Sequence, residues 1–126
     1  MSGPRTVTVQ TLDRGDVTLT CPDWCVSDDH GAGGYAADLA HEGAEHGLTV
    51  ATYLGPQTVL SCSLEKRPFA DKPPGTATVM SVDLGGDWVA HDAEELDLLS
   101  AALIGYGFRL RAQSRRLARL RGVEAS

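Results

Sequence analysis

The chain has 126 residues, of which 42% are hydrophobic and 22% charged, and its formal net charge is −6 at pH 7. These proportions are typical of a soluble globular protein, and the length predicts a single domain over residues 1–126. No apolar run approaches the roughly 20 residues that a membrane-spanning helix needs, so we expect no membrane protein. The N-terminal residues lack the apolar stretch of a secretory signal peptide, which predicts a cytoplasmic protein with reduced thiols.

Charge is divided unevenly along the chain. Residues 1–108 carry 16 acidic and 5 basic side chains, a net charge of −11. Residues 109–126 carry 6 Arg and 1 Glu, a net charge of +5. Because an acidic surface repels phosphate, only the Arg-rich C-terminal segment is suited to approach a nucleic acid.

Strand and turn patterns begin after residues 1–5, which we expect to be disordered. Residues 6–20 alternate polar and apolar side chains on both sides of a Gly-containing turn, a pattern that predicts a β-hairpin. Residues 21–47 begin as a loop rich in Gly, Pro and Asp. The last part of this segment, residues 35–47, predicts a short helix that ends at a glycine.

Residues 48–90 predict the main sheet. Three runs rich in β-branched residues alternate with period 2, and a fourth short segment either extends the sheet or caps it. These segments are residues 48–54, 58–65, 76–84 and 87–90. Cys62 lies in phase with Leu60 and Leu64 in the second run, so we expect its thiol in the core rather than in an active site.

The C-terminal part predicts a long helix over residues 92–121. Apolar residues recur there at spacings of three and four, with Asp92 as the N-cap and Gly122 beyond the last turn. Gly105 and Gly107 weaken this helix, since each costs about 1 kcal/mol relative to Ala in a helix interior. Strands followed by a terminal helix predict an α+β fold, with a small antiparallel sheet of about five strands, the short helix and the long helix.

Two cysteines and two histidines lie close together, although the chain has only 3 cysteines and 4 histidines. Structural zinc takes four Cys or His ligands in a tetrahedron, usually two from each of two short clusters. Cys21 and Cys25 form the first cluster, and the second is either His30 with His41 or His41 with His46. The His41 and His46 pair is closer to zinc-finger spacing, but glycines weaken the helix that would carry it. The alternatives to a metal site are a Cys21–Cys25 disulfide, or two reduced cysteines and three histidines that share no role.

The three sequence runs in this region, CPDWC, DDH and HEG, follow the predicted hairpin. Together they resemble a family of short uncharacterised actinomycete proteins with a CPxWC run, an Asp-His pair and a later His. The resemblance covers roughly residues 6–104 and leaves the Arg-rich segment outside the family pattern. The matching positions that it implies are Cys21, Pro22, Trp24, Cys25, Asp29, His30 and His41. Because His46 does not match, the resemblance implies zinc ligands at Cys21, Cys25, His30 and His41, with His46 as the alternate.

Catalysis is not indicated by this group. The sequence has neither the H-E-x-x-H motif of metalloproteases nor the paired motifs of zinc deaminases. Four available nitrogen and sulfur ligands favour a closed structural site over the open position of a catalytic zinc. We therefore expect a domain that is not an enzyme, and a metal-dependent hydrolase is the least favoured alternative.

The Arg-rich segment predicts a surface for a protein partner or for self-association. Leu110, Leu117 and Leu120 continue a repeat of about 3.5 residues, the spacing of a coiled-coil seam. Arg109 and Arg116 flank this seam and would repel each other in a parallel pair of copies. An antiparallel second copy or an acidic partner fits better, which predicts an interaction or regulatory module.

Two alternatives remain for this segment. One is a solvated amphipathic helix that only completes the fold. The other is a nucleic-acid-associated accessory protein, although no aromatic residue follows Phe108 to stack on bases. The arginines available for phosphate contacts in that case are Arg109, Arg111, Arg115, Arg116, Arg119 and Arg121.

Overall fold

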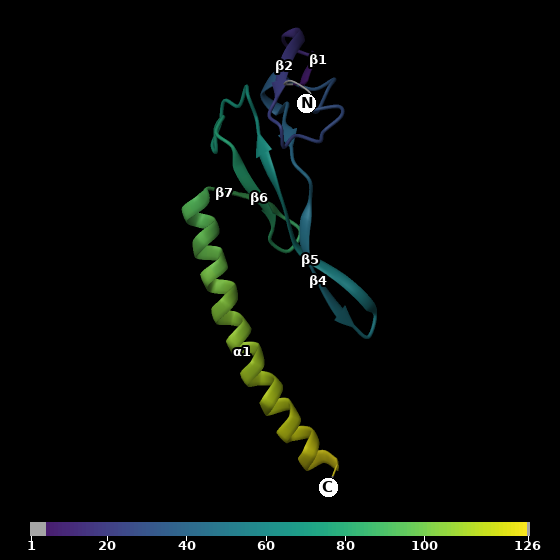
Figure 1. Cartoon of the computed structure of the whole chain (residues 1–126), viewed down its shortest axis with the longest axis vertical. Helices are drawn as coiled ribbons and strands as arrows, with labels where there is room; N and C mark the ends of the chain where they lie inside the picture. The colour runs from purple at the N-terminus through teal and green to yellow at the C-terminus, as the bar shows by residue number, and fades with distance from the viewer. Residues whose placement is uncertain (1–4, 126) are drawn as a thin grey trace. The chain divides into compact units, whose positions relative to one another are not determined.

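The computed structural model describes residues 5–125 and divides at Asp92 into two units, a β-rich body and a C-terminal helix (Figure 1). The fold is α+β, as the sequence predicts. The predicted disorder of residues 1–4 lies outside the described residues, whereas Arg5 is the first residue of a strand.

The body begins with the predicted β-hairpin. Strand β1 (Arg5–Thr11) pairs antiparallel with β2 (Gly15–Cys21) as a separate two-stranded sheet. The turn between them ends at Gly15, whose φ of +63° lies in the left-handed region that favours glycine. In this register Arg5 faces Cys21, so the hairpin confirms the prediction for residues 6–20 and extends it by one residue at each end.

The short helix predicted after the loop is confirmed only as a 3-10 turn, η1 (Ala36–Asp38). The rest of the predicted range was assigned wrongly, because strand β3 (His41–Glu42) and the start of β4 (His46–Thr52) occupy it. Backbone pairing explains the difference, since the amide of Gly43 donates to the carbonyl of Leu64 at 2.8 Å. A segment with two glycines has little helix propensity to compete with such long-range pairing.

The larger sheet has five antiparallel strands, and β5 (Gly55–Lys66) is its central element. Strands β3 and β4 pair with opposite ends of β5, with His41 opposite Lys66 and Thr52 opposite Gly55. On the other side follow β6 (Val79–Asp83) and β7 (Trp88–His91). All four runs predicted in residues 48–90 are therefore strands, and the fourth extends the sheet.

The core of the body lies at the hairpin end. Val9 and Leu19 from the hairpin pack with Leu39, which follows η1 and is fully buried, and Phe69 lies against this cluster. Cys62, which we expected in the core, is only partly buried. The apolar core is thus small and sits beside the end of β2, which places Cys21 at its border.

The second unit is one continuous helix, α1 (Ala93–Ala125). It runs through Gly105, Gly107 and Gly122, so the predicted end at residue 121 is wrong. The Ala, Leu and Arg residues around these glycines have high helix propensity, which outweighs the local cost of each glycine. Over the described residues, no helix has the length and apolarity needed to cross a membrane.

Gly15 and Gly105 allow a matched test of the backbone conformation, left-handed at the first position and helical at the second. A Cβ atom added at Gly15 or at Gly105 would have no neighbour within 4 Å, so only the backbone conformation separates the two sites. We expect Gly105→Ala to stabilise α1 by about 1 kcal/mol. We expect Gly15→Ala to destabilise the body by about 1 kcal/mol, because an L-residue is strained at positive φ.

Urea unfolding measures both effects. Helix circular dichroism follows α1, and tryptophan fluorescence follows the body, which contains both tryptophans, Trp24 and Trp88. A stabilising Gly15→Ala change would contradict the assigned turn.

Candidate metal centre

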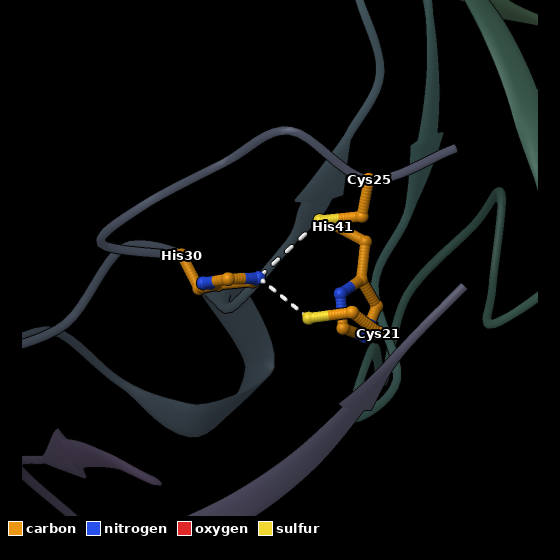
Figure 2. A group of neighbouring side chains, drawn as sticks. All are labelled: Cys21, Cys25, His30 and His41. Atoms are coloured by element: carbon orange, nitrogen blue, oxygen red, sulfur yellow. Dashed lines mark hydrogen bonds between the residues drawn. The ribbon is translucent and has the colours of Figure 1, made fainter. Parts of the chain in front are cut away.

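Four side chains converge where the hairpin meets the larger sheet (Figure 2). Cys21 is the last residue of β2, Cys25 and His30 lie in the following loop, and His41 opens β3. Their ligand atoms all lie within 4.8 Å of one another, and all four residues are buried. The structure thus brings together the residues of the first predicted ligand set. His46, the alternate, is exposed in β4 opposite Cys62 and lies outside this group.

The loop between the two cysteines is shaped by backbone hydrogen bonds. The amide of Cys25 donates to the carbonyl of Pro22 at 3.0 Å, which closes a tight turn and returns the second sulfur towards the first. The next amide, from Val26, donates to the carbonyl of Glu42 at 2.8 Å and ties the loop to β3. The C-x3-C spacing therefore places both sulfurs beside the strand that carries His41.

His30 enters the group through an unusual backbone conformation. Its φ of +55° is left-handed, which is uncommon for a residue with a side chain, and Gly31 follows with a φ of +84°. The carbonyl of His30 accepts a hydrogen bond from the amide of Ala40 at 3.1 Å. This reversal of the chain directs the imidazole inward, where it is 1% exposed.

The distances in the group match those between ligands of one tetrahedral ion. Nε2 of His30 lies 3.3 Å from Sγ of both Cys21 and Cys25. Zinc–sulfur and zinc–nitrogen bonds of ordinary length place a sulfur and a nitrogen about 3.5 Å apart across a tetrahedron. These separations also permit hydrogen bonds between the imidazole and the sulfurs, which Figure 2 draws as dashed lines.

The other nitrogen of His30 sets its orientation. Nδ1 lies 3.4 Å from the backbone carbonyl of Asp28, in position to donate a long hydrogen bond. A metal-binding histidine ordinarily donates its second N–H to such an acceptor, which fixes the tautomer and frees the other nitrogen as a ligand. The contact with Asp28 therefore favours Nε2 of His30 as the ligand atom.

His41 carries an unsatisfied nitrogen. The residue is 2% exposed, and within residues 5–125 its buried Nδ1 has no hydrogen-bond partner. A buried polar atom without a partner costs about 1–3 kcal/mol, so this nitrogen fits a ligand that the protein itself does not supply. Burial, together with the charges of His30, Lys66 and Arg5, lowers the pKa of His41 below its ordinary value of 6.5. Its imidazole is thus neutral near pH 7, the form that binds a metal.

Arg5 is the residue of this site that the sequence interpretation missed. Its Nη2 lies 3.5 Å from Sγ of Cys21 and 3.5 Å from Sγ of Cys25, and it donates to the carbonyl of Ser27 at 3.0 Å. The hydrogen bond to Cys21 and the charge interactions with Cys21 and Cys25 raise the pKa of Arg5. Only the hairpin register, which pairs Arg5 with Cys21, would have indicated this contact.

Two neighbours implied by the family resemblance have supporting positions. The ring of Trp24 packs over Gly43, where an added Cβ would lie 3.4 Å from Cε3 of the indole. A carboxylate oxygen of Asp29 accepts a hydrogen bond from the amide of Gly31 at 3.2 Å, within the turn that presents His30. Asp29 is exposed and lies outside the four-residue group.

The predicted partner-binding residues all lie on α1. Leu110, Leu117 and Leu120 are 54%, 55% and 49% exposed. Arg109 and Arg116 beside them are also exposed. No residue of α1 among those described is buried.

The chain belongs to a family described as Domain of unknown function (DUF6907), whose sequence model matches residues 6–119. This range includes the four-residue Cys/His group. It also extends past residue 104 into the Arg-rich segment, which we had placed outside the family pattern. No curated protein and no solved structure matches the chain.

The stability of the metal-free protein should decrease as the pH is lowered, because the pKa of His41 lies below its ordinary value. Because the unfolded state takes up a proton near pH 6.5 and the folded state resists it, stability is complete above that pH and decreases below it. Urea unfolding at pH 7.5 and at pH values below 6.5 measures this decrease. His41→Gln should reduce the pH dependence, whereas His46→Gln, at an exposed histidine, should retain it. Equal stability across this range would contradict the prediction.

Proposed function

We propose that this member of the DUF6907 family is a non-enzymatic interaction module that a structural zinc ion stabilises. The observation that carries the proposal is the buried group of Cys21, Cys25, His30 and His41, whose ligand atoms lie within 4.8 Å of one another. Each residue supplies a donor atom that zinc prefers, and the set is one of the usual ones for structural zinc.

Charge supports zinc in this buried position. Two thiolates balance a divalent cation, and two neutral imidazoles add no charge, so the complete centre is neutral. A neutral centre avoids the large desolvation cost of an isolated buried ion. Thiolate and imidazole ligands together favour zinc over magnesium or calcium, which prefer oxygen ligands.

A structural role follows from where the ligands originate. Cys21 belongs to the hairpin, Cys25 and His30 to the loop, and His41 to the larger sheet. Among the described residues, the buried apolar cluster beside these parts consists of Val9, Leu19 and Leu39, with a few partly buried neighbours. Small domains with limited cores commonly depend on a metal for stability. The ion would therefore crosslink the hairpin to the sheet.

The ligand set also supports the absence of catalysis. A catalytic zinc keeps three protein ligands and one exchangeable water. Here four protein ligands are available within the described residues, and each of them is buried. A closed centre of this kind lacks a position for a substrate, which is why we place the function in binding rather than in chemistry.

The interaction element of this module is α1, and we propose a second copy of the chain as its partner. Its heptad seam consists of Leu96, Leu99, Leu103, Tyr106, Leu110, Gln113, Leu117 and Leu120. Gln113 is the one polar residue in this seam, which spans more than three heptads, the length that indicates a coiled coil. A helix that exposes such a seam gains stability when another helix covers it.

Charge decides the orientation of the two helices. The first half of α1, residues 93–108, carries Glu94, Glu95 and Asp97 and no basic residue. The second half carries all six arginines of the segment and one Glu. Antiparallel copies place each acidic half beside a basic half, whereas parallel copies place the two basic halves together. We therefore propose an antiparallel pair.

Elemental analysis of purified protein tests the metal centre. We expect about one zinc per chain in the parent, in line with one four-ligand site, and loss of zinc in Cys21→Ser and His30→Ala. These variants should also lose stability, by about 4 kcal/mol where free zinc would exceed the dissociation constant 1,000-fold.

His46→Ala is the matched control, because His46 is exposed outside the group and should retain the metal. A parent without zinc, purified in the absence of chelator, would refute the proposed centre. Zinc retained in His30→Ala but lost in His46→Ala would identify His46, rather than His30, as the fourth ligand.

Light scattering tests the second copy. The parent should have twice the monomer mass, and Leu110→Gln with Leu117→Gln should reduce it to the monomer mass. Leu98→Gln with Ile104→Gln, exposed apolar positions of α1 outside the seam, should leave the dimer intact. Salt should weaken an antiparallel pair, because it screens attraction between the unlike halves.

A monomeric parent would refute self-association. Salt-dependent binding of duplex DNA by that monomer, lost on deletion of residues 109–126, would support the nucleic-acid alternative.

A further inference from the structure

We propose that Arg5 is a positioning residue of the metal centre, whose guanidinium holds both cysteine sulfurs in the geometry that retains the ion. The inference rests on the proposed zinc site and adds the residue that determines how tightly the site keeps its metal. Arg5 lies outside the ligand set and acts through Cys21 and Cys25.

A single nitrogen of Arg5 bridges the two sulfurs. Nη2 is 3.5 Å from Sγ of Cys21 and 3.5 Å from Sγ of Cys25, so it contacts both sulfurs at the same distance. The same nitrogen is 3.0 Å from the carbonyl oxygen of Ser27. This third contact anchors the guanidinium to the loop that carries Cys25 and His30.

The fold delivers Arg5 to this position from a distant part of the sequence. Arg5 precedes Cys21 by 16 residues and Cys25 by 20, yet the hairpin register places it directly across from Cys21. The turn closed by the amide of Cys25 and the carbonyl of Pro22 then brings the second sulfur within reach. The first residue of β1 thus completes a site built by the end of β2.

The charge of Arg5 suits this task. The two sulfurs lie within 4.8 Å of each other, and a cation in contact with both offsets the repulsion that would arise when both carry charge as metal ligands. Charge-assisted hydrogen bonds to the sulfurs also restrict their positions, so less rearrangement is required when a metal binds. Outer-shell partners of this kind typically contribute about 10-fold to 100-fold to metal affinity.

The guanidinium is better suited than an ammonium group to this arrangement. All three contacts come from Nη2, which the rigid, planar guanidinium holds in place, whereas a lysine ammonium is a compact point charge on a flexible stem. Arg5→Lys therefore separates the effect of charge from the effect of bridging. Arg5→Gln removes the charge and retains a polar side chain.

The hairpin offers a matched control in Arg14. This arginine also belongs to the body, but its guanidinium lies 5.1 Å from the ring centroid of Phe69 and does not take part in the Cys/His group. Arg14→Gln removes the same charge from the same hairpin. It should alter packing at Phe69 while zinc retention stays at the parental level.

Zinc release into excess chromogenic chelator provides the measurement, with the zinc-loaded full-length chain. We expect Arg5→Gln to lose zinc about 10-fold to 100-fold faster than the parent, in proportion to the outer-shell contribution. The zinc-release rate of Arg5→Lys should lie between those of the parent and Arg5→Gln, and the rate of Arg14→Gln should equal that of the parent. Cobalt-substituted protein adds a second readout, because loss of a hydrogen bond to sulfur should shift the sulfur-to-cobalt charge-transfer bands in Arg5→Gln.

Each contrary outcome has a distinct meaning. A parent that binds no zinc refutes the metal centre itself. If the parent binds zinc and Arg5→Gln releases it at the parental rate, the proposed role of Arg5 is refuted and the metal centre is retained. Zinc release from Arg5→Lys at the parental rate refutes the requirement for a guanidinium, because a positive charge at this position would then suffice. Faster zinc release from Arg5→Gln with unchanged cobalt bands refutes the proposed action at the sulfurs, because Arg5 would then act by holding the hairpin through Ser27. If Arg5→Gln fails to fold, the zinc-release rate and the cobalt charge-transfer bands of Arg5→Lys test the role of Arg5 instead.

Discussion

The structure of the body depends on the convergence of two sulfurs and two imidazoles at the junction between the hairpin and the larger sheet. Burial removes the water that would otherwise solvate these groups, and the buried His41 Nδ1 has no protein partner among the described residues to replace it. Such burial is unfavourable unless another interaction compensates for it. The cation that we propose at the centre of the group would satisfy all four ligand atoms at once, and the polar junction would then link the two sheets more strongly than the small apolar cluster does.

Local patterns in the sequence were sufficient to predict the elements that depend on local forces. Alternation with a glycine turn predicted the hairpin, and apolar spacing predicted the long helix. The motif resemblance selected His30 over His46, and the fold now supplies a physical reason. His41 and His46 belong to different strands that pair with separate parts of β5, opposite Lys66 and Cys62 respectively, so they do not lie on one helical face.

Features that depend on long-range pairing escaped the sequence interpretation. The segment around His41 was predicted as helix because its Ala, Leu and Glu residues favour one, but strand pairing with β5 prevailed. Arg5 was assigned to a disordered terminus because nothing in its immediate neighbourhood indicates a role. Its contacts appear only when β1 and β2 are aligned and the turn after Cys21 is closed, and both conditions require the folded backbone.

The short strand β3 determines how the body would respond to loss of the proposed metal. It contains only His41 and Glu42, shorter than the usual strand of 3–10 residues, and it pairs with just the end of β5. A strand this short gains little from its own ladder, so a bond from His41 to the proposed ion would add to the few backbone hydrogen bonds that hold it, such as those from Val26 to Glu42 and from Gly43 to Leu64. Release of the proposed ion would loosen β3 and expose more of one edge of β5, the kind of surface through which chains aggregate. Charged Glu65 and Lys66 at that edge would then oppose intermolecular pairing, a protection that would matter once the proposed ion has left.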